Sequence, residues 1–154
     1  MTDTSALDRE RTVLLTRRFA AAPEAVFRAW TDPAEIAQWY GPDGWHAPVD
    51  RIQVDPAVGG RWEVTMVRRS DGYEFPIGYE ILELQEPSLI VLRYTGENGL
   101  EQPSLIRIML AADGDGTLMT LADGPMPAEG RDHAAGGYEQ AFEKLAALLG
   151  VGPI

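Results

Sequence analysis

Residues 132–150, DHAAGGYEQAFEKLAALLG, decide the fold of this chain. Apolar residues recur there at three- and four-residue steps, at Tyr138, Ala141, Phe142, Leu145, Leu148 and Leu149. This spacing predicts one amphipathic helix, and Gly150, Gly152 and Pro153 predict its end, since glycine supplies a left-handed cap and proline cannot continue the helix. A lone helix of this length is marginal in water, so its apolar side must lie on another element.

Upstream of this helix, apolar and polar residues alternate with a period of two, which is typical of strands. The predicted strands are residues 13–19, 49–54, 61–68, 73–84, 89–94, 104–110 and 117–121. Tight turns join most of them, which predicts an antiparallel meander. Residues 122–131 are predicted to be a Pro/Gly loop that crosses from the sheet edge to the helix.

Two short helices are predicted after the first strand. Pro23 starts the first, while Asp32 caps the second, with Pro33 in its first turn and Glu35 completing a capping box. Residues 41–48 are rich in Gly and Pro and are predicted to be a loop. The order of elements predicts an α+β fold, in which a curved antiparallel sheet of about six to seven strands wraps the long C-terminal helix and leaves a cavity.

The composition predicts a single domain over residues 11–154 that follows a frayed polar tail at residues 1–10. Hydrophobic residues make up 45% of the chain, as in globular proteins, and the net charge of −11 argues against nucleic acid and anionic lipid as partners. The chain has no cysteine, which excludes disulfides, thiolate zinc sites and cysteine nucleophiles. No apolar run approaches membrane-spanning length, so we expect a cytoplasmic protein without membrane insertion.

Residues 17–45, RRFAAAPEAVFRAWTDPAEIAQWYGPDGW, resemble the opening segment of the activator of Hsp90 ATPase homologue 1-like family, within the START/Bet v 1-like superfamily. The segments at residues 59–62, 78–81 and 116–117 and the Gly137-Tyr138 pair extend the similarity over residues 12–149. This resemblance implies a helix-grip fold around a ligand pocket. The superfamily includes small-molecule carriers, polyketide cyclases and aromatases, and an Hsp90 co-chaperone domain, so the fold alone does not choose among these functions.

Aromatic, methionine and aliphatic residues at candidate inward positions predict a pocket for a hydrophobic or aromatic ligand. The expected ligand-binding residues are Trp39, Tyr40, Trp45, Trp62, Val64, Met66, Tyr79, Ile81, Tyr94, Ile108, Met119, Tyr138 and Phe142. The alternative is that these side chains fill an ordinary core. The leading hypothesis is a module that binds a lipid, a polyketide or a similar small molecule, without a cofactor or a metal.

Three polar residues, His46, Tyr40 and Arg107, are weak candidates for catalysis. Neutral His46 could act as a general base, although a loop histidine is more often exposed to solvent. Arg107 would reach a pocket only if its side chain faced inward, and we favour Ile106 and Ile108 as the inward set. If two of the three candidates converged on the cavity, the chain would resemble a cyclase or aromatase.

Three further expectations complete the sequence-based picture. A chaperone-activating domain ranks behind the binding module and the enzyme, and a homodimer paired through an edge strand is compatible with the sequence. The two histidines, His46 and His133, lack the spacing of a single-helix metal pair. Gly136 and Gly137 lie inside the predicted helix, where each costs about 1 kcal/mol relative to Ala, so we expect a close backbone approach or a flexible pocket entrance there.

Overall fold

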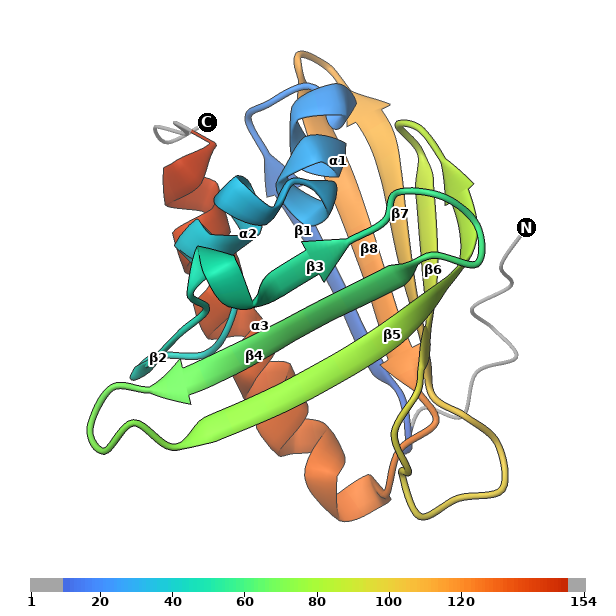
Figure 1. Cartoon of the computed structure of the whole chain (residues 1–154). Helices are drawn as coiled ribbons and strands as arrows, with labels where there is room; N and C mark the ends of the chain where they lie inside the picture. Colours follow the sequence, from blue (N-terminus) through green and yellow to red (C-terminus); the bar gives the residue numbers. More distant parts are fainter. Residues whose placement is uncertain (1–9, 150–154) are drawn as a thin grey trace.

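A computed structural model describes residues 10–149 of the chain. The predicted tail, apart from Glu10, and the predicted helix end at Gly150 lie outside these residues. A curved antiparallel sheet curls around the long helix α3 (Ala128–Leu148), and the short helices α1 (Pro23–Thr31) and α2 (Pro33–Trp39) lie at one end of the sheet (Figure 1). The predicted α+β helix-grip fold is confirmed.

The sheet contains eight strands in the order β1-β8-β7-β6-β5-β4-β2, and β3 also pairs with β4. The strands are β1 (Val13–Phe19), β2 (Trp45–His46), β3 (Ile52–Val54), β4 (Arg61–Arg68), β5 (Glu74–Gln85), β6 (Leu89–Tyr94), β7 (Leu105–Asp113) and β8 (Gly116–Gly124). Seven of them were predicted from the alternation of apolar and polar residues. The eighth, β2, lies in a segment that was predicted to be a loop, because two residues are too few to show a period.

The predicted strand at residues 49–54 is wrong in its first half. Residues Val49–Arg51 form a 3-10 helix, η2, in which the Arg51 N–H donates to the Pro48 carbonyl at 2.9 Å. Only β3 joins the sheet, where Ile52 pairs with Val64 of β4. The fixed φ of Pro48 starts this turn before the ladder begins.

The predicted loop at residues 122–131 is also wrong over most of its length. β8 continues to Gly124, because Ala122 and Asp123 pair with β1 on one side and β7 on the other, which satisfies their backbone groups. Pro127 then precedes the first turn of α3, so the helix begins at Ala128, four residues earlier than predicted. Only residues 125–127 separate the sheet from the helix.

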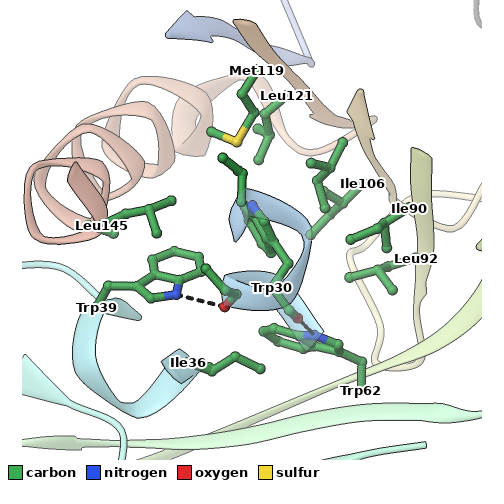
Figure 2. Close-up of a cluster of buried hydrophobic side chains, with 14 of the residues drawn as sticks. Trp30, Ile36, Trp39, Trp62, Ile90, Leu92, Ile106, Met119, Leu121 and Leu145 are labelled. Carbon is green, nitrogen blue, oxygen red and sulfur yellow. Dashed lines mark hydrogen bonds between the residues drawn. The ribbon is translucent and has the colours of Figure 1, made fainter. Parts of the chain in front are cut away.

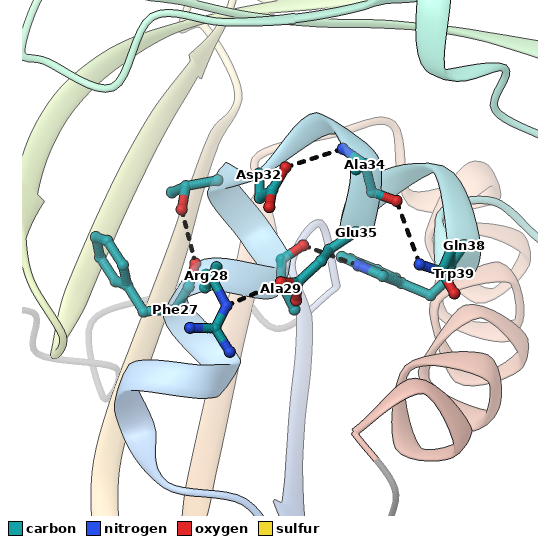
Figure 3. Close-up of polar contacts among 9 residues, drawn as sticks. Phe27, Arg28, Ala29, Asp32, Ala34, Glu35, Gln38 and Trp39 are labelled. Atoms are coloured by element: carbon teal, nitrogen blue, oxygen red, sulfur yellow. Dashed lines mark hydrogen bonds and ion pairs between the residues drawn. The ribbon is translucent and has the colours of Figure 1, made fainter.

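The N-terminus of α2 is capped by Asp32 as predicted, since its Oδ1 accepts the Ala34 N–H at 3.0 Å (Figure 3). The predicted capping box is not completed, because the Asp32 N–H donates to the Arg28 carbonyl. Glu35 instead accepts a hydrogen bond from Arg28 at 2.8 Å. These contacts couple the end of α1 to the start of α2.

Three tryptophans, Trp30, Trp39 and Trp62, lie at the centre of the core, and each is 1% exposed (Figure 2). The Trp39 Nε1–H donates to the Ala29 carbonyl at 2.9 Å, and the Trp62 Nε1–H donates to the Trp30 carbonyl at 2.7 Å. Both carbonyls belong to the last turn of α1, where no intrahelical donor remains. Indoles from α2 and β4 therefore cap α1. The Trp30 Nε1–H itself has no partner within residues 10–149.

We predict that Trp39→Phe and Trp62→Phe will destabilise the protein more than Trp30→Phe does. Trp39→Phe and Trp62→Phe each leave a buried carbonyl without its donor, whereas Trp30→Phe removes a donor that has no partner. The first two should therefore be more destabilising than Trp30→Phe by about 1–3 kcal/mol. Denaturant unfolding of the three variants measures this difference, and equal losses would contradict the capping role.

Candidate ligand-binding cavity

A cavity of about 260 Å³ lies between the sheet and the N-terminal half of α3. Its lining residues come from the end of α2 and the segment after it, from β4 and β5, from β8 and from α3. They are Trp39, Tyr40, Gly41, Pro42, Met66, Phe75, Ile77, Tyr79, Asp123, His133, Ala134, Gly137, Tyr138 and Ala141. Most of these side chains are apolar or aromatic, and Asp123 is the one carboxylate among them.

The sheet wall of the cavity follows from the pairing of β4 with β5. Met66 lies opposite Phe75, and Trp62 lies opposite Tyr79, so the inward side chains of the two strands alternate along the same face. Phe75 is 42% exposed and Tyr79 is buried. This wall therefore runs from the protein surface into the core.

The helix wall of the cavity is one face of α3. His133, Gly137 and Ala141 follow one another at four-residue steps, and Ala134 and Tyr138 lie beside them. The segment after α2 is held against this helix by the Asp43 N–H, which donates to the Gln140 side chain at 2.9 Å.

Gly136 and Gly137 do not mark a close backbone approach, so that part of the sequence-based expectation is wrong. A Cβ atom added at Gly136 would meet no atom within 4 Å, and one added at Gly137 would meet the Pro42 Cβ at an ordinary 3.7 Å. Gly137 lines the cavity and Gly136 does not. Gly41, by contrast, has a φ of 101°, which favours glycine at the turn between Tyr40 and Pro42.

Asp123 is the polar centre of the cavity. It extends the inward series of β8 after Met119 and Leu121, and it pairs with Val13 of β1 and Ile106 of β7. The side chain is only 8% exposed. Its Oδ2 accepts a hydrogen bond from the Tyr138 hydroxyl at 2.7 Å. Sequence reasoning missed Asp123 because it ended the strand at Leu121, although the alternation itself points to an inward residue at 123.

Burial raises the pKa of Asp123 and of three phenols near it. Burial raises the pKa of Asp123 to about 6, and the hydrogen bond from Tyr138 opposes this rise. Burial, followed by the negative charge of Asp123, raises the pKa of Tyr40 above its ordinary value. Burial also raises the pKa of Tyr79 and of Tyr138, so all three phenols stay neutral at neutral pH.

Of the thirteen predicted ligand-binding residues, the cavity brings together five: Trp39, Tyr40, Met66, Tyr79 and Tyr138. Tyr94 lines a smaller adjoining pocket of about 130 Å³, which it shares with Asp123. Val64 and Tyr94 also border a larger depression of about 750 Å³ over β3, β4 and β5, whose other residues are mainly polar or exposed. The cavity of about 260 Å³ is a stronger candidate site than this depression, because it has aromatic walls and a buried carboxylate.

The other predicted ligand-binding residues lie outside this cavity. Trp62, Ile81, Ile108, Met119 and Phe142 are buried in the hydrophobic core and are not among its lining residues. Trp45 packs instead against Tyr73 and Phe75 at the end of the β4–β5 hairpin, with centroid distances of 6.2 and 6.5 Å.

The three candidates for catalysis do not meet. Tyr40 lines the cavity, whereas His46 lies on β2 opposite Val67, and its Nδ1 is buried without a partner within residues 10–149. Arg107 alternates with the buried Ile106 and Ile108, which places it on the outer face of the sheet, as preferred from the sequence. Neither His46 nor Arg107 lines the cavity.

The described part of the chain contains neither a metal-binding cluster nor a membrane-spanning helix. Residues 10–149 contain no group of three or more His, Cys, Asp or Glu side chains arranged to hold a metal ion. No helix in that range is long and apolar enough to cross a membrane.

Comparisons with known proteins agree with this architecture. The family model described as "Activator of Hsp90 ATPase homolog 1-like protein" matches residues 20–150. A crystal structure from Chromobacterium violaceum is similar with a TM-score of 0.82 and 25% identity, covering 92% of this chain and 99% of that one. The AHSA1 protein from Silicibacter pomeroyi is similar with a TM-score of 0.75 and 25% identity, covering 90% and 97% of the two chains.

A third solved structure, from Nitrosomonas europaea, has a TM-score of 0.79 at 21% identity and covers 94% of this chain and 97% of its own, which shows the shared fold. No curated protein matches this sequence.

We predict that Asp123 makes the stability of the protein depend on pH between about 4 and 6. The unfolded chain ionises Asp123 near its ordinary pKa of 3.8, while the folded chain ionises it near about 6. The stabilising contribution of protonated Asp123 is therefore complete below about pH 4 and is lost as the pH rises through about 6, by about 3 kcal/mol.

The measurement compares the free energy of unfolding of the wild type with that of Asp123→Asn, which does not titrate. The advantage of the variant over the wild type should grow by about 3 kcal/mol between about pH 4 and pH 7. Tyr138→Phe removes the hydrogen bond that opposes the rise, so it should move the transition to higher pH. A difference between wild type and Asp123→Asn that does not change with pH would show that Asp123 is not buried as described.

Proposed function

We propose that this chain, which belongs to the family of activator of Hsp90 ATPase homolog 1-like proteins, binds a small hydrophobic or aromatic molecule between the sheet and α3. The cavity that carries this proposal is lined by aromatic and apolar side chains around one buried carboxylate. Binding sites for small molecules combine such walls with a few polar groups that fix the orientation of the ligand. We propose the cytoplasm as the compartment of this function, because a chain without cysteine is compatible with a reducing environment.

The size of the cavity limits the ligand. Its volume of about 260 Å³ lies just below the roughly 300–1,000 Å³ typical of sites for drug-sized molecules. A molecule built on one ring, on two fused rings or on a short aliphatic chain fits this space, and a long acyl chain exceeds it. We therefore favour a small aromatic compound over a membrane lipid.

An enzyme of the cyclase or aromatase kind would need its polar candidates to converge on the ligand. Of His46, Tyr40 and Arg107, only Tyr40 lines the cavity. We therefore propose no reaction. A protein that acts only through a chaperone partner would keep its function when the cavity is filled by a larger side chain. A ligand-binding protein would lose its function.

We predict that Gly137→Leu will block the cavity and that Gly136→Leu will not. The two glycines are neighbours in α3, and both changes replace a poor helix former with a good one, so each variant should gain about 0.5–1 kcal/mol in helix stability. Only the side chain at 137 faces the cavity. Calorimetry and thermal shift with indole, 1-naphthol and 2-phenylethanol measure the binding.

For any of the three probes that the wild type binds, affinity should fall at least about tenfold in Gly137→Leu and stay unchanged in Gly136→Leu. Equal binding by wild type and Gly137→Leu would place the site elsewhere. A wild-type protein that binds none of the probes would overturn the proposal.

A further inference from the structure

The carboxylate of Asp123 lacks a cation although it is buried inside the cavity. Its Oδ2 accepts the Tyr138 hydroxyl, and within residues 10–149 no side chain donates to Oδ1. Carboxylates other than Asp123 pair with seven arginines: Arg17, Arg18, Arg28, Arg51, Arg68, Arg93 and Arg131. Burying an ionised carboxylate without a partner charge is costly, and a single neutral hydrogen bond offsets only part of that cost.

The elements packed around Asp123 supply no positive charge among the residues that line the cavity. Its strand neighbours Val13 and Ile106 are apolar. The titratable groups that face it are phenols: Tyr138 from α3, Tyr79 from β5, Tyr40 from the segment after α2, and Tyr94 from β6, which shares the adjoining pocket with Asp123. The remaining titratable residue of the lining, His133, is exposed at the rim of the cavity. The residues that line the cavity therefore supply no Lys or Arg to balance the carboxylate.

The walls of the cavity also favour a positive charge. Trp39 and Tyr40 have ring centroids 5.5 Å apart, and Tyr79 and Tyr138 line the same cavity. The faces of aromatic rings carry negative potential and attract ammonium groups, most strongly where water is excluded. The net charge of −11 over the whole chain adds a field that attracts cations and repels anions.

We propose that this cavity binds a small protonated amine with an aromatic or apolar body. The ammonium group donates to Asp123, next to the Tyr138 hydroxyl and among the aromatic rings. The apolar body lies against Met66, Phe75 and Ile77, which form the sheet wall toward the surface. This inference rests on the proposed binding function and narrows it to one class of ligand.

Three probes of nearly the same shape test the charge preference: 2-phenylethylamine, 2-phenylethanol and 3-phenylpropionate. At about pH 7.5, where Asp123 with its pKa of about 6 is ionised, the wild type should bind the amine about 10- to 100-fold more tightly than the alcohol. The carboxylate probe should bind more weakly than the alcohol. Calorimetry measures all three affinities.

Two variants show whether Asp123 is responsible for this preference. Asp123→Asn keeps the shape of the side chain and removes its charge, so the ratio of the amine affinity to the alcohol affinity should fall to about one. Gly136→Leu, at a position that does not line the cavity, should keep the wild-type preference. Carbon NMR of the wild type adds a measurement that needs no variant, because a bound amine should lower the pKa of the Asp123 carboxyl and the bound alcohol should not.

Each outcome separates this inference from the broader binding function. Equal affinities for amine and alcohol, or a preference that survives in Asp123→Asn, would overturn the amine assignment and leave the binding function standing. If none of the three probes binds while indole or 1-naphthol does, the amine assignment is wrong and the binding function stands; if all five compounds fail, both proposals are wrong.

Discussion

The arrangement of this molecule depends on two indole N–H groups that cap one short helix. The last carbonyls of α1 have no donor of their own, and burying them unsatisfied would cost about 1–3 kcal/mol each. Trp39 from α2 and Trp62 from β4 supply the missing donors while their rings fill the core. Because a hydrogen bond fixes direction as well as distance, these two contacts lock α1, α2 and the sheet into one relative orientation (Figure 2).

The same contacts determine where the cavity lies. Trp39 is the last residue of α2, and its ring both donates to Ala29 and lines the cavity. The chain then leaves the helix through Tyr40 and turns at Gly41, so Tyr40 is delivered beside Trp39 at a centroid distance of 5.5 Å. A core interaction therefore positions two walls of the binding site. Tyr40 also contacts Trp62 at 5.2 Å, which joins the aromatic wall of the cavity to the packed core.

The sequence predicted the fold well where a regular period ran through the whole element. The strands at 13–19, 61–68 and 89–94 have the predicted bounds, because alternation and turn residues agree there. Asp123 was not predicted as a site residue, because the Pro and Gly residues after it suggested a loop. Pairing on both sides of β8 keeps the chain extended there. The cavity could not be predicted residue by residue, since apolar residues that line it and those that fill the core follow the same inward pattern.

The ionised carboxylate of Asp123 lowers the stability of the empty protein, although it would strengthen the binding of a cationic ligand. A buried apolar residue there would continue the series of Met119 and Leu121, whereas an ionised carboxylate with one neutral donor lowers the stability of the fold at neutral pH. A ligand that supplied a positive charge would return this free energy on binding, because it neutralises the group that destabilises the empty protein. The carboxylate therefore links occupancy of the cavity to the stability of the fold. The fold tolerates this loss of stability, because the indole hydrogen bonds that orient α1, α2 and β4 do not involve Asp123.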